Sequence, residues 1–151
     1  MEPTSKAVII AKEAGVLGFS VMFNPKELQV DKTVSWTAAS TKGQKTEDPK
    51  QEFKEPQAST MAVTLYFDTY ETGEDVYDKY IKELEKTVKM VDGKGRPPLT
   101  TFQWNNFNFE GVVESLSQKY TMFLASGLRV RCEVALQMKS ASAVGVASGK
   151  T

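Results

Sequence analysis

The chain has 151 residues, with 19 lysines and arginines balanced by 19 aspartates and glutamates, and it contains no histidine. This length suits a single domain that can bury a core without disulfides or metal ions. Zero net charge argues against a nucleic-acid-binding protein, which usually presents a basic face, and it favours self-association. Without histidine, the commonest general base and metal ligand is missing. We therefore expect no catalytic, cofactor or metal site and no small-molecule substrate.

The only cysteine, Cys132, lies on the apolar side of a predicted strand, so an internal disulfide is impossible. This position indicates a buried packing residue, because the alternative, a nucleophilic thiol, lacks a histidine to activate it. The apolar run at residues 7–11 is too short for a signal peptide, and no segment reaches membrane-spanning length. We expect a protein that is made in a reducing cytosol, is not exported by the general secretory route and does not enter a membrane.

The first part of the chain predicts three strands. Residues 5–12 are rich in β-branched side chains, and residues 19–23 alternate between large apolar and smaller side chains. Asn24-Pro25 should end the second strand, because proline removes a backbone donor. Residues 28–36 alternate again, and Lys32 on their apolar side indicates an edge strand or a bulge.

A polar segment follows at residues 37–59. It has mixed charge, two prolines and a single large apolar residue, Phe53. Such a segment contributes little to a core. Two interpretations stay open: a long surface loop without regular structure, or an arm that becomes ordered against a neighbouring subunit.

Residues 61–67 alternate as another strand, and the apolar period then changes to that of a helix. Thr72 and Asp75 have the spacing of a capping box, and the helix should span about residues 74–91. Its apolar stripe consists of Tyr77, Ile81, Leu84, Val88 and Val91. The opposite, lysine-rich face is typical of a solvated surface.

The second half predicts four more strands at residues 99–104, 107–113, 115–124 and 128–138. Ser126-Gly127 is a turn signal that joins the last two strands into a long antiparallel hairpin. Gly111 within a strand indicates a bulge or a close approach of another backbone. An aromatic cluster indicates core packing rather than a stacking platform for bases or carbohydrate; it consists of Phe102, Trp104, Phe107 and Phe109.

This order of elements predicts an α+β fold that is mainly β. We expect a small antiparallel β-barrel or sandwich with one packed helix, because helices segregated to one side of an antiparallel sheet are typical of this class. The domain should span residues 1–139, and the small residues of 140–151 indicate a flexible tail.

A series of short motifs runs in a fixed order along residues 6–139. They are FNP at 23–25, LYFDT at 65–69, DV at 75–76, PP at 97–98, FQW at 102–104, FEGV at 109–112, YTMF at 120–123 and Gly127 before RVR at 129–131. In order and spacing the chain resembles the tube proteins of contractile injection systems, which are related to phage tail-tube proteins and to the haemolysin-coregulated proteins of type VI secretion. It resembles most the tube-initiator or hub-adaptor branch, the N-terminal domain of LysM-containing baseplate proteins.

The sequence departs from this pattern in two ways. Asn105 follows Trp104 where the family often has glycine, and no LysM module follows the domain. Peptidoglycan binding is therefore not expected of this chain.

The resemblance implies a non-enzymatic, cofactor-free homo-hexamer that forms a ring between the spike and the inner tube of a phage-tail-like particle. Its partners would be spike and inner tube proteins, and it would be cytoplasmic on synthesis and then part of the particle, inside the cell or released. The residues that we expect at subunit interfaces are Asn24, Pro25, Lys42, Lys45, Phe53, Phe123 and Arg129.

Three alternatives remain. The chain could be a repeating subunit of the inner tube instead of a single ring. It could be a monomeric ligand-binding barrel, which requires a concave apolar pocket. It could be an enzyme without histidine, which requires acids with shifted pKa values; Asp68 at a strand end and the pair Glu47-Asp48 are the acids available, although strand-end aspartates usually cap turns.

Overall fold

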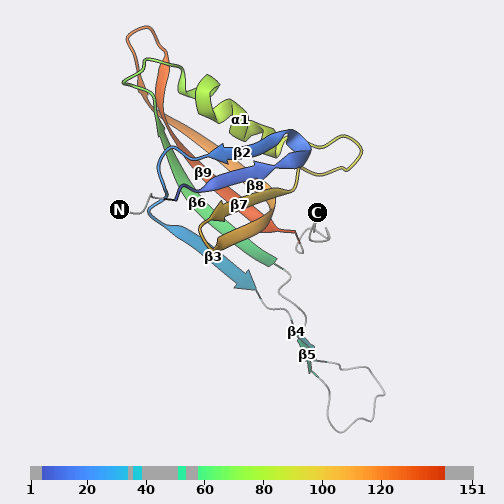
Figure 1. Cartoon of the computed structure of the whole chain (residues 1–151). Coiled ribbons are helices and arrows are strands. Elements are labelled where there is room, and N and C mark those ends of the chain that lie inside the picture. The colour runs from blue at the N-terminus through green and yellow to red at the C-terminus, as the bar shows by residue number, and fades with distance from the viewer. Residues whose placement is uncertain (1–4, 34–35, 39–50, 54–57, 142–151) are drawn as a thin grey trace, which may run out of the picture.

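The computed structural model describes residues 5–33, 36–38, 51–53 and 58–141. Seven antiparallel strands form one sheet in the order β2-β1-β7-β8-β9-β6-β3, and β4 and β5 form a separate pair (Figure 1). The strands are β1 (Val8–Ala11), β2 (Val16–Ser20), β3 (Leu28–Thr33), β4 (Trp36–Ala38), β5 (Gln51–Phe53), β6 (Ala58–Asp68), β7 (Thr100–Trp104), β8 (Phe107–Phe123) and β9 (Arg129–Ser140). With one helix, this confirms the predicted α+β, mainly β fold.

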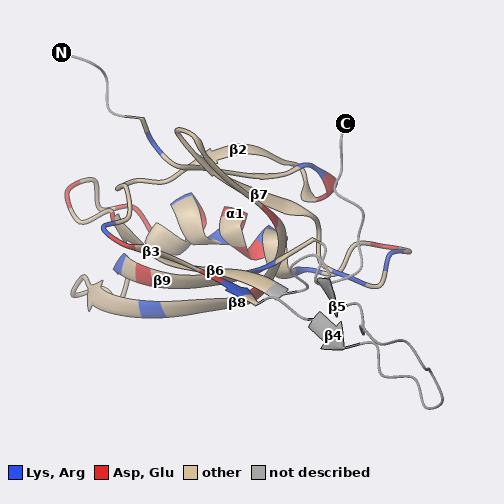
Figure 2. Ribbon diagram, turned by 90° about the horizontal axis from the view of Figure 1, so that it is seen from below, with Lys and Arg blue, Asp and Glu red and all other residues tan. Residues whose placement is uncertain are grey.

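The sheet bends so that two layers face each other. Figure 2 shows β2 and β7 on one side of the helix and β6, β8 and β9 on the other. β8 passes from one layer to the other, because its first residues pair with β7 and the rest pair with β9. The enclosed space holds the core, whose largest fully buried side chains include Ile9, Phe67, Phe102 and Leu136.

β8 corrects the prediction of two strands at 107–113 and 115–124. The strand is continuous over 17 residues, and the break in alternation is a register shift between Val113 and Ser115. A bulge inserts one residue without ending a strand. The alternation of apolar and polar residues is therefore interrupted there, although the strand continues. The predicted close approach at Gly111 is confirmed: this residue pairs with both Thr100 and Ser140, and a Cβ there would lie 1.8 Å from the Lys139 carbonyl oxygen.

The helix is shorter than the expected 74–91 and spans residues 77–88. It begins with a π-helical turn, η2 (Tyr77–Ile81), continues as α1 (Lys82–Glu85) and ends in a 3-10 turn, η3 (Lys86–Val88). The Asp75 carboxylate accepts a hydrogen bond from the Tyr77 backbone N–H at 2.8 Å, which caps the first turn. Lys89 has extended backbone angles, and Val91 donates its backbone N–H to the Arg96 carbonyl instead of continuing the helix.

The second strand also lies elsewhere than expected. The sequence predicted residues 19–23, but β2 begins after the 3-10 turn η1 (Lys12–Ala14) and ends at Ser20. Gly15, with φ of 79°, provides the left-handed residue that reverses the chain before β2. Residues after Val21 form a loop that the Asn24 side chain holds in place, as described below.

The polar segment 37–59 contains regular structure that the sequence did not reveal. β4 and β5 pair in it, with Trp36 opposite Phe53, and β6 already begins at Ala58. Residues 39–50 and 54–57 lie outside the described part of the chain. The predicted strand at 28–36 ends at Thr33, and its prediction as an edge strand is confirmed because β3 ends the sheet. At the other terminus, β9 reaches Ser140, and most of the predicted tail lies outside the described residues.

Candidate assembly interface

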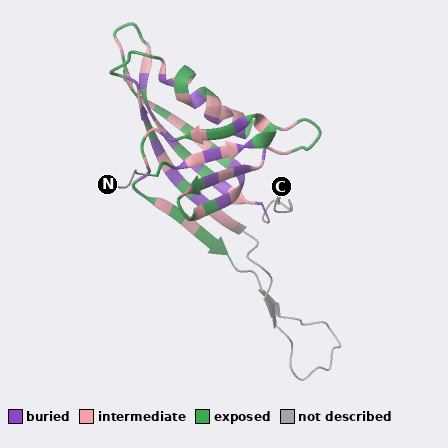
Figure 3. Cartoon of the chain, viewed as in Figure 1, coloured by how far each residue is buried: buried purple, intermediate pink, exposed green. Residues whose placement is uncertain are grey.

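Four neighbouring strands present a continuous polar surface to the outside. They are β3, β6, β9 and the second half of β8. Buried residues alternate with more exposed ones along β6 and β9 (Figure 3), and half-buried residues alternate with exposed ones along β8 from Ser115. The residues of this surface, here called the polar face, are Gln29, Asp31, Ala62, Thr64, Tyr66, Asp68, Ser115, Ser117, Lys119, Thr121, Arg131, Glu133, Ala135 and Gln137. Small side chains at its centre line an open hollow of about 490 Å³.

Charges on the polar face offset one another. Arg131 forms an ion pair with Asp68 at 3.0 Å across β6 and β9, and Lys119 lies opposite Glu133 in the register of β8 and β9. These exposed pairs add little to stability. Their consequence is a surface without a strong field of either sign, which differs from the basic stripe of a nucleic-acid-binding protein.

The polar face has an open strand edge on each side. β3 ends the sheet on one side. On the other side β7 pairs with β8 only as far as Gly111, and no other strand in the described part of the chain pairs with this edge from Val113 to Phe123. Unpaired edges expose rows of backbone donors and acceptors that can join another chain. The two edges could therefore pair between copies and extend the polar face.

Arg129 joins the β8–β9 hairpin to the helix. Its guanidinium carbon lies 4.7 Å from the ring centre of Tyr77 and 5.3 Å from that of Tyr120, and it forms an ion pair with Asp75 at 3.3 Å. A planar guanidinium can stack on two rings and still donate to a carboxylate. Arg129 therefore faces the helix of its own subunit.

The contacts around Arg129 form a larger group, here called the helix–hairpin cluster. The Tyr77 hydroxyl donates to Glu85, Gln118 Nε2 donates to the other Glu85 oxygen at 2.9 Å, and the Tyr120 hydroxyl donates to Gln118 at 2.8 Å. The hydrogen bonds from Tyr77 and then Gln118 lower the pKa of Glu85. Burial raises the pKa of Tyr120 to about 12. The lowered pKa keeps Glu85 as a carboxylate that accepts hydrogen bonds, and the raised pKa keeps the Tyr120 hydroxyl protonated so that it can donate one.

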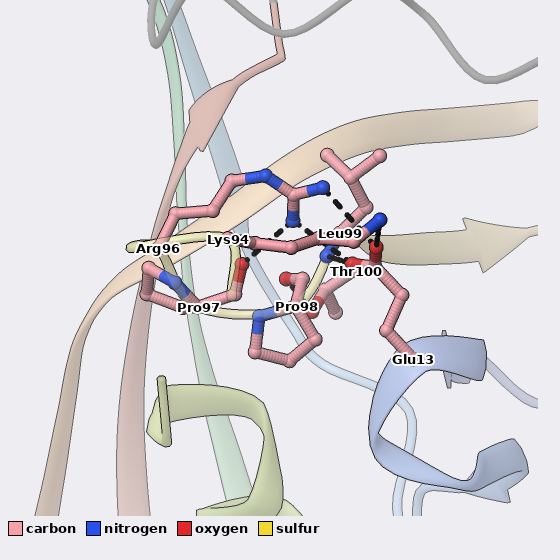
Figure 4. Close-up of polar contacts among 7 residues, drawn as sticks. All are labelled: Glu13, Lys94, Arg96, Pro97, Pro98, Leu99 and Thr100. Carbon is pink, nitrogen blue, oxygen red and sulfur yellow. Dashed lines mark hydrogen bonds and ion pairs between the residues drawn. The ribbon is translucent and has the colours of Figure 1, made fainter. Parts of the chain in front are cut away.

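A second polar cluster, which sequence analysis missed, surrounds Glu13 (Figure 4). Its carboxylate accepts hydrogen bonds from Arg96 at 2.9 and 3.1 Å and from the Leu99 backbone N–H at 2.8 Å, and it forms an ion pair with Lys94 at 2.8 Å. Arg96, then Lys94, then Leu99 hold the pKa of Glu13 well below its usual range. No local pattern could reveal contacts between residues more than 80 positions apart.

The structure separates the residues that were expected at interfaces. Phe123 lies at the hairpin end of β8, opposite Arg129, and is 54% exposed. Asn24 instead contacts its own chain: its side-chain oxygen accepts from the Ala7 N–H at 3.0 Å, and its nitrogen donates to the Ser5 carbonyl at 2.8 Å. Pro25 is buried. Lys42 and Lys45, like the side chain of Phe53, lie outside the described residues, so their expected interface role stays a prediction.

Metal-binding clusters and thiol reactivity can be examined in the described residues. They contain no group of three or more histidine, cysteine, aspartate or glutamate residues that could hold a metal ion. Cys132 is buried, as expected, and burial raises the pKa of its thiol, which disfavours the reactive thiolate. In this part of the chain no helix is both long and apolar enough to cross a membrane.

Comparison with known proteins places the chain in a family. The family described as contractile injection system tube protein matches residues 5–145. No curated protein matches the chain. The family match extends over both sheet layers, the helix and the β8–β9 hairpin, and it agrees with the resemblance of the sequence motifs. The chain therefore belongs to the family of contractile injection system tube proteins.

Proposed function

We propose that six copies of this chain form a ring at the hub of a phage-tail-like particle, between the spike and the inner tube. The family supports a role in the tube, and the six-fold symmetry and the hub position follow from the resemblance of the motifs. In this proposal the ring is structural and has no catalytic role.

The observation that carries the ring is the polar face with an open edge on both sides. A contact between the β3 edge of one copy and the β8 edge of the next is a head-to-tail contact, which closes into a ring when the rotation between copies is right. Closure pairs the edges of all copies. The polar face would then line the central channel, because a sheet that closes in this way has an inner surface and an outer surface.

A disulfide ladder tests this contact directly. Because Cys132 is buried, a new pair of cysteines would be the accessible thiols. One cysteine replaces Asp31 on β3, and the second replaces Ser117, Lys119 or Thr121 on β8 in three separate variants. Only pairs whose Cβ atoms lie within about 4.5 Å form a disulfide readily. At least one variant should give oxidised species on a denaturing gel that rise in steps and end at six subunits.

The control for this experiment pairs Asp31→Cys with Asp78→Cys on the exposed face of the helix, away from both edges. This control should remain monomeric on the gel. A ladder in the control, or none beyond dimers in all three edge variants, would contradict the proposed contact.

The native mass of the purified protein and negative-stain images decide between the proposal and the alternative of a repeating tube subunit. Single rings of six support a hub ring, and long stacks of rings support a repeating subunit. A strict monomer, both alone and with the spike protein present, would contradict both.

A further inference from the structure

The first residues of β8 have a strand on one side only. Over residues 107–111 β8 pairs with β7, and its pairing with β9 begins at Gly111, opposite Ser140. The last described residue, Ala141, adds one further bond, because its backbone N–H donates to the Glu110 carbonyl at 3.1 Å. No other strand in the described part of the chain pairs with β8 on this side before Glu110. The backbone there is an open edge, which can accept another strand.

The register at this end of the sheet shows where the open backbone groups point. Along a strand of an antiparallel sheet, successive residues direct their N–H and C=O groups to alternate sides. The Glu110 carbonyl is turned toward Ala141, so Asn108, two residues earlier, has its N–H and C=O on the same side, at the open edge. If β9 continued past Ala141 in this register, Ala143 would lie opposite Asn108.

A pocket of about 640 Å³ lies beside this edge. It is lined by residues 107–110 of β8, Val30 and Lys32 of β3, Ser59 of β6 and Ser140 of β9. Phe109 is 8% exposed and Phe107 packs half-buried against the core, so the wall formed by β8 is aromatic. Because β9 lies between β6 and β8 in the sheet and ends at Ser140, the pocket lies where the next residues of β9 would run.

The sequence after Ala141 continues the alternation of β9. Every second residue of β9 is buried over residues 130–138. The same count of two continues with Ser140, Ser142, Val144 and Val146. Facing residues of antiparallel strands have their side chains on the same side of the sheet, so Val144 would face Phe107 on the side of the pocket. Residues 140–149 contain no charged residue and no proline, which suits a strand against an aromatic wall.

We propose that residues 142–146 continue β9 along the open edge of β8 and place Val144 and Val146 in this pocket. The backbone of Ala143 pairs with Asn108, and Val144 packs against Phe107. The family match supports this assignment, because it extends to residue 145, beyond the last described residue. The flexible tail that the sequence predicted from residue 140 then begins only after residue 146.

The covalent connection favours this segment over a separate molecule as the occupant. Ala141 is already bonded to β8, so the residues that follow it are held beside the pocket at a high effective concentration. The pocket has the aromatic wall that a small apolar ligand would need. In this proposal the chain fills the pocket itself, and no ligand binds there.

Cysteine pairs test the register in the full chain. Asn108→Cys with Ala143→Cys places thiols at facing positions, whose Cβ atoms lie about 4.5–5.5 Å apart in paired strands. Asn108→Cys with Val144→Cys is the matched control, because neighbouring residues of a strand point to opposite faces. Asn108 is exposed and Cys132 is buried, so the new thiols are the accessible ones. After the same mild oxidation, the first pair should give at least about tenfold more disulfide within one chain, measured by mass spectrometry of tryptic fragments.

Two outcomes of the oxidation overturn the proposal. Equal yields from the two pairs would show a segment without a fixed register on β8. A disulfide between two chains, seen as a dimer on a denaturing gel without reductant, would assign the pocket to a second copy.

Hydrogen exchange gives a second measurement without new cysteines. Removal of residues 142–151 should speed exchange of the Asn108 amide at least about tenfold, because this amide loses its partner. Removal of residues 147–151 alone should leave the exchange rate unchanged. Val144→Asp should also speed exchange, since it places a charge against an aromatic wall, whereas Ala143→Asp, on the opposite face, should not.

An unchanged exchange rate after removal of residues 142–151, or equal effects of the two aspartate variants, overturns the proposal. Both measurements use the isolated chain, and neither depends on contacts between subunits. Their failure therefore leaves the proposed ring unaffected.

Discussion

Single polar side chains hold together segments that no strand or helix connects. Asn24 satisfies the backbone of Ser5 and Ala7, and Glu13 binds the connector that contains Arg96. Buried or partly buried backbone groups need such partners, and loops obtain them from side chains. Asn24 was expected at a subunit interface, yet its amide is occupied within the subunit. The structure thus supports a role for it in the fold.

Gly111→Ala should severely destabilise the protein. The added methyl group would lie 1.8 Å from the Lys139 carbonyl oxygen, where three paired strands leave no room for the backbone to move. We expect a loss of about 3 kcal/mol or more in the free energy of unfolding, measured with urea, because overpacking against backbone is among the costlier core changes. Gly18→Ala is the control, since the added methyl group would meet only Val8 Cγ1, at 4.0 Å. Equal stability of the two variants would contradict the close approach.

Glu13→Gln should destabilise the protein in a pH-dependent manner. The folded state lowers the pKa of Glu13, so its contribution is fully present above the pKa of the unfolded chain, about 4.3, and is lost as pH falls toward the folded pKa. We expect the variant to be about 1.5–3 kcal/mol less stable at neutral pH, the typical contribution of a hydrogen bond to a charged group. The difference in free energy of unfolding between wild type and Glu13→Gln, measured with urea, should be smaller at about pH 2.5, because the Glu13 carboxyl is then protonated in the unfolded chain.

The control for Glu13 is Glu71→Gln, which alters an exposed glutamate. It should change stability by less than about 0.5 kcal/mol at either pH. A difference between wild type and Glu13→Gln that is the same at both pH values would show that the carboxylate charge is not what stabilises the connector.

At the scale of elements, the helix is short and starts with a π-helical turn, so its position depends on contacts with the β8–β9 hairpin. Its buried residues Ile81 and Leu84 pack into the core, and the helix–hairpin cluster fixes its first half from the other side. Short helices derive most of their stability from such tertiary contacts. The hairpin and the helix should therefore behave as one unit.

Arg129→Gln should loosen this unit. The change removes the cation between Tyr77 and Tyr120 and its ion pair with Asp75. We expect a loss of about 1–2 kcal/mol in the free energy of unfolding, since desolvated cation–π contacts and charged hydrogen bonds each contribute at this level. Faster hydrogen exchange of the amides in residues 77–88 should accompany it.

Arg131→Gln is the matched control for Arg129. Like Arg129, Arg131 forms an ion pair with an aspartate, in its case Asp68 on β6. Its side chain is 48% exposed, however, and exposed ion pairs contribute about 0–1 kcal/mol to stability. If Arg129→Gln unfolds like the wild type and fails to form rings, Arg129 acts at the subunit contact that the sequence predicted, and not in the helix–hairpin cluster.

At the scale of the whole molecule, the two layers have different surfaces. One layer presents the polar face between two open edges. The exposed apolar residues Leu17, on β2, and Val88 and Met90, at the end of the helix, lie outside this face. Phe123 is an exposed large apolar residue at the hairpin end of the open β8 edge.

Phe123→Ser should reduce assembly without changing the fold. Because the side chain is 54% exposed, the free energy of unfolding should change by less than about 0.5 kcal/mol. The fraction of protein in rings, measured by light scattering after size-exclusion chromatography, should fall. Met90→Ser, which changes another exposed apolar residue just after the helix, is the control and should leave this fraction unchanged. An equal fall in the ring fraction for both variants would contradict a role of Phe123 in the proposed contact.

By itself, the sequence determined the fold class, most of the strands, the helix and the close approach at Gly111. These features are local. A period of two residues in a strand, or of about four in a helix, indicates which side chains share a face, and a glycine within a strand indicates that another backbone comes close. Only the tertiary structure decided that β8 is one strand shared by two layers, that Asn24 and Arg129 face their own subunit, and that Glu13 meets Arg96. The physical reason is that alternation shows which face of a strand is dry, while the choice of neighbour depends on residues far away in the chain.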